Sequence, residues 1–197
     1  DLDQFRPRGL HDFRDAESPA DLDELAPGND DLVLLALGEV PPDENESGGA
    51  IRNAGSVGRR HRAVELLAQA VARAMVAGGR GGKIINIVSM LSFQGGVRVA
   101  SYTASKSGLL GLTRLLANEW AAKGINVNAI APGYFVTNNT EALRGDANRN
   151  RAILDRIPAG RWGVPAELGG AAVFLASAAA DYVHGAVLPV DGGWLAR

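Results

Sequence analysis

Hydrophobic and polar positions follow two periods along this chain, one typical of helices and one typical of strands. The pattern predicts helices over residues 62–77, 102–123, 141–157 and 166–177. Short apolar runs predict strands over residues 32–37, 83–88, 125–130 and 186–190. Strands that alternate with helices indicate an α/β fold, in which a mostly parallel sheet is covered by helices on both faces.

A change of composition near residue 50 divides the chain into two predicted parts. Residues 1–50 carry 14 acidic and 3 basic residues, a net charge of −11, whereas residues 51–197 sum to +9. The sequence therefore predicts an acidic, atypical N-terminal segment over 1–50 and an α/β core over 51–197. The basic core could attract a phosphate-bearing ligand, or the acidic segment could lie against it.

Composition and charge exclude several classes of protein and site. Apolar residues make up 46% and charged residues 21% of the 197 residues, which favours a globular domain. There is no apolar run of eighteen residues and no signal-peptide pattern, so we expect no membrane partner. Basic residues are scattered without aromatic neighbours, so we expect no nucleic-acid partner either. Three dispersed histidines and no cysteine predict no metal site, and the lack of cysteine is typical of a cytoplasmic protein.

Three residues form a candidate catalytic group. Ser89 directly follows the predicted strand 83–88, and parallel sheets bind ligands at the carboxyl ends of their strands. Tyr102 and Lys106 are four residues apart at the start of a helix, so their side chains share one face. An ammonium beside a phenol favours the phenolate, which could accept a proton while a serine hydroxyl binds a substrate oxygen. Most Tyr–Lys pairs at this spacing are nevertheless solvated neighbours.

The surrounding motifs resemble the short-chain dehydrogenase/reductase family. The motifs are Ile87–Ser89, the Tyr-x-x-x-Lys of Tyr102–Lys106, the stretch Asn126–Gly133, and Thr137 downstream. The offset of thirteen residues from Ser89 to Tyr102 also matches the family. Residues 79–197 look most like the 2-deoxy-D-gluconate 3-dehydrogenase branch of that family, through the stretches Ser89–Gly96, Arg161–Gly163 and Asp181–Gly185.

The resemblance implies a Rossmann-like three-layer fold and hydride transfer between a nicotinamide cofactor, NAD or NADP, and a small-molecule alcohol or ketone. Tyr102 would act as acid and base, Lys106 would assist it and hold the nicotinamide ribose, and Ser89 would position the carbonyl. The nicotinamide side of the cofactor would be lined by Pro132, Gly133 and Thr137. The family is commonly oligomeric, so a homo-oligomer, either a dimer or a tetramer, is expected.

The N-terminal part departs from the family pattern, which predicts that its βαβ portion is reduced or remodelled. The family's glycine-rich phosphate-binding turn is not found in residues 1–50. Asn53, Ala54 and Gly55 look like the N-A-G turn beside the adenine end of the cofactor, and the position of the family's catalytic asparagine falls near Arg60. The segment 55–60 could alternatively form a phosphate-binding loop before the first helix, or a basic loop without a ligand.

Three function classes follow from these residues. The first is an NAD(P)-dependent oxidoreductase acting on a sugar acid or similar small molecule. The second is a cofactor-independent ester hydrolase with Ser89 as nucleophile and Tyr102 with Lys106 as base. The third is a catalytically silent member of the family. The sequence favours the first.

Overall fold

The chain is built around a parallel sheet. The computed structural model describes residues 32–35 and 54–197. Four strands pair in parallel in the order β1-β2-β3-β4, and they comprise β1 (Leu32–Leu35), β2 (Gly82–Ile87), β3 (Ile125–Pro132) and β4 (Val187–Val190). The predicted α/β class with a parallel sheet is confirmed. The predicted boundary at residue 50 and the glycine-rich turn sought in 1–50 lie outside the described residues.

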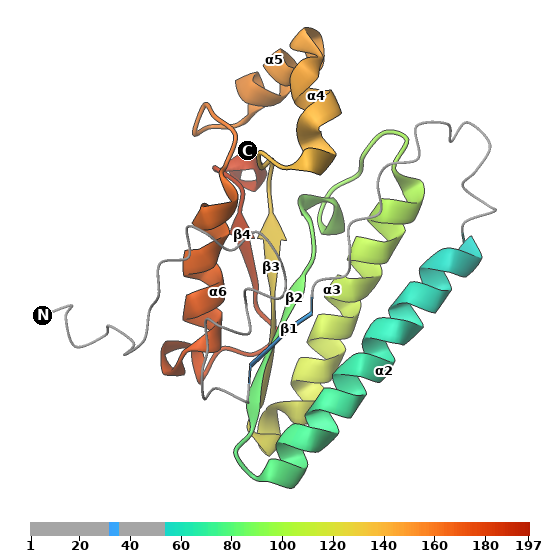
Figure 1. The fold of residues 1–197 in the computed structure, drawn as a ribbon, viewed down its shortest axis with the longest axis vertical. Coiled ribbons are helices and arrows are strands. Elements are labelled where there is room, and N and C mark those ends of the chain that lie inside the picture. Colours follow the sequence, from blue (N-terminus) through green and yellow to red (C-terminus); the bar gives the residue numbers. More distant parts are fainter. Residues whose placement is uncertain (1–31, 36–53) are drawn as a thin grey trace, which may run out of the picture.

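Helices cover both faces of the sheet (Figure 1). The long helices α2 (Ala54–Gly78) and α3 (Ala100–Trp120) pack on one face, and α6 (Gly169–Ala176) packs on the other. Two short helices, α4 (Glu141–Gly145) and α5 (Ala147–Arg156), lie beyond the end of β3. Short 3₁₀ turns connect these elements: η3 (Met90–Ser92), η4 (Ala121–Lys123), η5 (Asn138–Thr140), η6 (Pro165–Leu168), η7 (Ala178–Ala180) and η8 (Trp194–Ala196).

The two-sided core explains why β2 and β3 are apolar without a break. Successive side chains of a strand point to opposite faces, so Ile84 packs with Leu109 under α3 while Ile85 packs with Leu175 under α6. Asn86 is also buried, and its Nδ2 donates to Thr113 Oγ1 at 2.9 Å. A buried amide needs a partner, and this hydrogen bond supplies one for the Nδ2 group.

Three predicted helix boundaries were wrong, for local reasons. The expected helix 141–157 is broken at Asp146, whose backbone is extended and whose carboxylate accepts from the N–H groups of Asn148 and Arg149 as the N-cap of α5. The expected helix 166–177 begins as the 3₁₀ turn η6. The first helix starts eight residues earlier than predicted, at Ala54 rather than Arg62, so residues 55–60 form helical turns instead of a phosphate-binding or basic loop. Glycine-rich composition suggested a loop there, but composition alone does not exclude helix.

Helices α2–α6, in the part of the chain that the structure describes, include no segment that is both long and apolar enough to cross a bilayer.

Two glycines, Gly81 and Gly124, directly precede β2 and β3 and lie against each other. Gly81 has φ +75°, and a Cβ built on it would lie 2.2 Å from the carbonyl oxygen of Gly124. That oxygen accepts a hydrogen bond from the N–H of Gly82 at 3.1 Å, which begins the pairing of the two strands. A side chain at residue 81 is therefore excluded by both backbone conformation and space.

Replacing Gly81 by alanine is expected to destabilise the fold by at least about 3 kcal/mol, because a left-handed conformation and a backbone clash add together. Gly79→Ala is the matched control, since Gly79 has φ +71° but nothing within 4 Å of its would-be Cβ. The control should cost about 1 kcal/mol. Urea unfolding measures both, and equal losses would contradict the close approach of the two strands.

Candidate active site

The residues that follow β2 and β3 meet in one cavity at the carboxyl edge of the sheet. Ser89 follows β2 by two residues, Gly133 directly follows β3, and Tyr102 lies in the first turn of α3. All three line a cavity of about 470 Å³, as do Met90, Leu91, Gln94, Gly96, Val97, Val99, Tyr134, Asn139, Thr140, Leu143, Arg149, Ala152 and Ile153. The sequence placed the first two at the edge where ligands of parallel sheets bind, and the structure brings Tyr102 to the same space.

Ser89 is held rigidly at the entrance to η3. Its side chain is 7% exposed, and its Oγ accepts from the N–H of Leu91 at 3.2 Å. The neighbouring Ser92 hydroxyl donates to the carbonyl of Lys106 at 2.8 Å. The turn that carries Ser89 is therefore attached to the helix that carries Tyr102, which fixes the two hydroxyl-bearing residues relative to each other.

Lys106 lies beneath the cavity rather than in its lining. The side chain is 4% exposed, and its Nζ donates to the carbonyl of Ile87 at 2.8 Å. The same Nζ lies 5.7 Å from the centre of the Tyr102 ring. A buried positive charge at this range stabilises negative charge on a phenol oxygen, and it attracts the face of the ring.

The remaining predicted cofactor residues occupy different places. Pro132 ends β3, and Thr137 caps η5, where its backbone N–H donates to Thr140 Oγ1 at 3.1 Å. Ala54 and Gly55 are the first residues of α2, so the expected N-A-G turn is helical at these two positions, and Asn53 lies outside the described residues. Arg60, near which the catalytic asparagine of the family was expected, also lies in α2.

Close backbone packing shapes the cavity wall at Gly133. A Cβ on this residue would lie 2.5 Å from the Cα of Asp191, in the turn after β4. In that turn the Asp191 carboxylate accepts a hydrogen bond from the N–H of Gly193 at 2.9 Å. Gly133 therefore lets the ends of β3 and β4 approach each other beside the cavity that Ser89 and Tyr102 also line.

Sequence reasoning missed Tyr134, which lines the cavity next to Gly133. Its ring packs edge-on against Trp162 and Trp194, with centroid distances of 5.3 and 4.7 Å. Burial raises the pKa of Tyr134, while the positive charges of Arg156 and Arg149 oppose that rise. The phenol therefore stays protonated at neutral pH and can donate a hydrogen bond. Its place directly after a strand-ending Pro-Gly was the signal that could have identified it.

Gln94, also missed, links the cavity to the C-terminal turn. Its Oε1 accepts from Arg156 Nη2 at 3.1 Å and from Trp194 Nε1 at 3.2 Å. Both partners can only donate, so this atom is the oxygen and the Nε2 group is the one left to donate. Trp194 is buried under the guanidinium of Arg156, 4.0 Å from the ring centre, so its ring contributes to packing.

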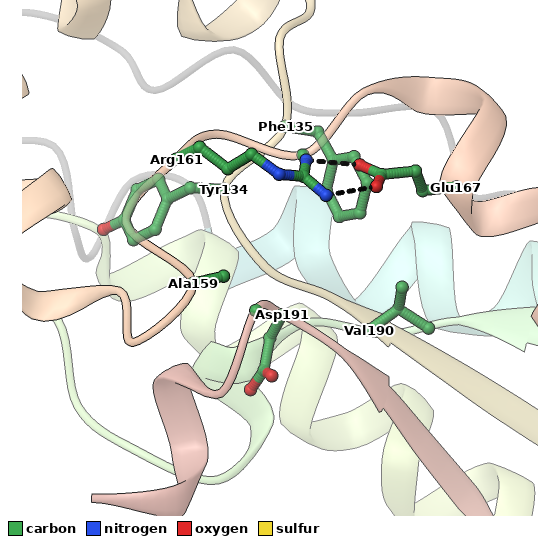
Figure 2. Close-up of a pocket in the computed structure, with 9 residues that line it drawn as sticks. Tyr134, Phe135, Ala159, Arg161, Glu167, Val190 and Asp191 are labelled. Carbon is green, nitrogen blue, oxygen red and sulfur yellow. Dashed lines mark hydrogen bonds and ion pairs between the residues drawn. The ribbon is translucent and has the colours of Figure 1, made fainter.

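A second, smaller cavity of about 110 Å³ lies beside Tyr134 and Phe135 (Figure 2). At its edge the guanidinium of Arg161 and the carboxylate of Glu167 face each other and form two hydrogen bonds. Glu167 also accepts from the N–H of Val164 at 2.8 Å. These bonds from Arg161 and Val164 lower the pKa of Glu167 to about 2. The pair stabilises the segment between α5 and α6, and neither of its side chains lines the first cavity.

The pKa of Glu167 is expected to rise toward 4.5 in Arg161→Gln, because the main stabilising partner of the carboxylate is removed. Since the folded pKa lies below the unfolded one, the stabilisation by this pair is present above pH 4.5 and is lost as pH falls toward 2. Carbon-detected NMR titration measures the pKa. An unchanged value of about 2 in the variant would contradict the assigned cause.

The described residues fit the nicotinamide end of a dinucleotide cofactor. A cavity of about 470 Å³ is large enough for a nicotinamide ring and a small substrate together, and its lining includes the hydroxyl-bearing residues Ser89 and Tyr102. No cluster of three or more potential metal ligands occurs in the residues that the structure describes.

Comparisons with known proteins show to which family the chain belongs. A family model described as Enoyl-(Acyl carrier protein) reductase matches residues 60–195. A 2-dehydro-3-deoxy-D-gluconate 5-dehydrogenase from Dickeya dadantii is 67% identical over 136 residues, which cover 69% of this chain and 54% of the relative. The chain therefore spans about half the length of this curated relative.

Two solved structures are also similar. A protein from Agrobacterium tumefaciens, described as a 2-deoxy-D-gluconate 3-dehydrogenase with bound NADP, is 72% identical with a TM-score of 0.67, over 68% of this chain and 55% of that one. A gluconate 5-dehydrogenase from Burkholderia cenocepacia, in complex with NADP and tartrate, is 40% identical with a TM-score of 0.69, over 85% and 66%.

These relatives are dehydrogenases, and they give no support to the ester-hydrolase alternative. Their structures confirm the expected Rossmann-like fold. With the family model covering more than half of its residues, the chain belongs to the short-chain dehydrogenase/reductase family.

Proposed function

We propose that this chain is an NAD(P)-dependent oxidoreductase that interconverts a hydroxyl and a keto group on a sugar acid. The observation that carries the proposal is the meeting of Ser89, Tyr102 and Gly133 in one cavity, with the ammonium of Lys106 beneath the Tyr102 ring. The names of the relatives supply the substrate class, since they act on gluconate or a keto-deoxygluconate.

Each residue has a distinct role in this proposal. The Ser89 hydroxyl binds the substrate oxygen, and Tyr102 gives a proton to it during reduction or takes one during oxidation. Lys106 stabilises the phenolate that remains after proton donation, so the base can form near neutral pH. The nicotinamide, when bound, donates or accepts the hydride.

The cofactor residues follow from the family resemblance. Lys106 would hold the nicotinamide ribose, with Pro132, Gly133 and Thr137 beside the nicotinamide. Asn53, Ala54 and Gly55 remain the candidates for the adenine end. Bound NADP in the two similar structures supports a dinucleotide, and the choice between NAD and NADP is left to titration.

Tyr102→Phe is expected to lower turnover at least about 1,000-fold, because it removes the only proton that the phenol exchanges while keeping the ring. Tyr182→Phe is the matched control: Tyr182 is 100% exposed, and its replacement should leave turnover unchanged. The assay follows NADPH absorbance with a keto sugar acid.

Circular dichroism and thermal unfolding of both variants check that the fold is retained. A Tyr102→Phe protein that is folded and as active as the parent would overturn the assigned acid and base. A loss of activity in both variants would point to a general effect of losing a phenol.

We also propose a homo-oligomer and a cytoplasmic location. Leu66 and Leu67 of α2 and Leu115 of α3 are each about half exposed, and exposed leucines on packed helices favour contact with a second copy. The absence of cysteine from all 197 residues supports a reducing compartment. Light scattering tests the assembly, and a mass near 20.6 kDa in solution would contradict it.

A further inference from the structure

The main cavity contains one ionised side chain among its described lining residues. Arg149 reaches it from α5, whereas the other polar lining groups are hydroxyls and amides, from Ser89, Tyr102, Tyr134, Gln94, Asn139 and Thr140. The positive charge of Arg149 also opposes the rise in the pKa of Tyr134, another residue of the cavity lining. Arg149 is therefore the one ionised residue in the described lining that a ligand in this cavity would meet.

The position of Arg149 is set by the start of α5. Asp146 caps the helix, and its Oδ1 accepts from the backbone N–H of Arg149 at 3.1 Å and of Asn148 at 2.9 Å. This fixes the backbone at Arg149 and leaves its guanidinium directed by side-chain rotamers alone. Arg149, Ala152 and Ile153 of this helix line the cavity.

Two other arginines of this region have carboxylate partners, and Arg149 has none among the described residues. Arg151, two residues further along α5, lies 3.9 Å from the carboxylate of Asp155, and Arg161 is paired with Glu167. No carboxylate within ion-pair distance of Arg149 is found in the described ranges 32–35 and 54–197. Its charge is available to an anionic ligand.

The uncharged groups of the cavity suit a polyhydroxylated ligand. The Tyr134 phenol is protonated and can donate. The Nε2 group of Gln94 can also donate, because its Oε1 is already occupied by Arg156 and Trp194. Asn139 and Thr140 add further polar contacts along the wall. One cation among several hydroxyl and amide groups matches the chemistry of a sugar monocarboxylate.

We propose that Arg149 is the specificity-determining residue of this site, binding the carboxylate of a sugar acid whose reacting carbon lies at Ser89 and Tyr102. The inference rests on the proposed function for the reacting end of the ligand, and it adds the group that recognises the acid. Arginine presents paired N–H donors that match the two oxygens of a carboxylate, so the neutral polyol of the same length loses this contact.

The test compares binding of D-gluconate with binding of its neutral analogue D-glucitol by isothermal titration calorimetry, without cofactor. The unmodified chain should bind gluconate about 10- to 100-fold more tightly than glucitol, the usual effect of a charge-assisted hydrogen-bond pair. Arg149→Met should reduce gluconate affinity to that of glucitol and leave glucitol affinity unchanged. Arg151→Met, on the same helix, should bind both ligands like the parent.

Four results would overturn the inference. The first three are no gluconate binding by the parent chain at millimolar ligand, equal affinities for the two ligands, and undiminished gluconate binding by Arg149→Met. Equal losses in Arg149→Met and Arg151→Met would assign the effect to net charge and also overturn it.

Turnover with NADPH separates this inference from the proposed function. Gluconate binding that depends on Arg149 without any turnover leaves Arg149 as the anchor and rejects the oxidoreductase. Turnover that Arg149→Met does not change rejects Arg149 as the anchor and leaves the proposed oxidoreductase standing.

Discussion

The parallel pairing of β2 with β3 is the constraint on which the site depends. Gly82 pairs with Ile125 and Ile87 with Ile130, so both strands run to the same edge of the sheet, where β3 continues two residues further to Pro132. Beyond the end of β2, the N–H of Val88 still donates to the carbonyl of Ile130 at 2.9 Å. Ser89 and Gly133 therefore leave the sheet at the same edge. A shift of one residue in this register would turn Ile84 and Ile85 to the wrong faces, so burial of both faces protects the register and the site together.

Two hydrogen bonds attach helix α3 to that edge, one with β2 and one with η3. The ammonium of Lys106 reaches the carbonyl of Ile87, and the Ser92 hydroxyl reaches the carbonyl of Lys106. These bonds are largely shielded from water, which makes each stronger than at a surface and makes an unpaired partner costly. Proximity of Ser89, Tyr102 and Lys106 is thus built into the folded chain rather than assembled by a ligand.

The sequence predicted the architecture well because the architecture depends on local pattern. Apolar runs located all four described strands. Motif spacing singled out Ser89, Tyr102 and Lys106, whose catalytic roles stay a prediction; the structure places Ser89 and Tyr102 in one cavity lining and Lys106 Nζ 5.7 Å from the Tyr102 ring. The sequence did not predict the helix boundaries that depend on single residues rather than on a periodic pattern. The break at Asp146 depends on a capping carboxylate within a polar stretch, and the early start of α2 involves glycines that composition assigns to loops.

The walls of the cavity could not be predicted because they come from distant segments. Arg149 and Gln94 are polar residues on exposed or half-exposed elements, where nothing in their immediate sequence distinguishes them from solvated neighbours. The C-terminal turn connects the two: Trp194 donates a hydrogen bond to Gln94 in the loop after β2, and its ring packs against Arg156 of α5. Tyr134 was the exception, since its position after a strand end carried a usable signal.

Titration of the purified chain with NADPH, followed by tryptophan fluorescence, tests the central claim most directly. The three tryptophans include Trp162 and Trp194, which both pack on the cavity residue Tyr134, so a ligand in the cavity should quench their emission. We expect saturable binding at micromolar NADPH. No binding up to millimolar NADPH would contradict a nicotinamide site at the carboxyl edge of this sheet.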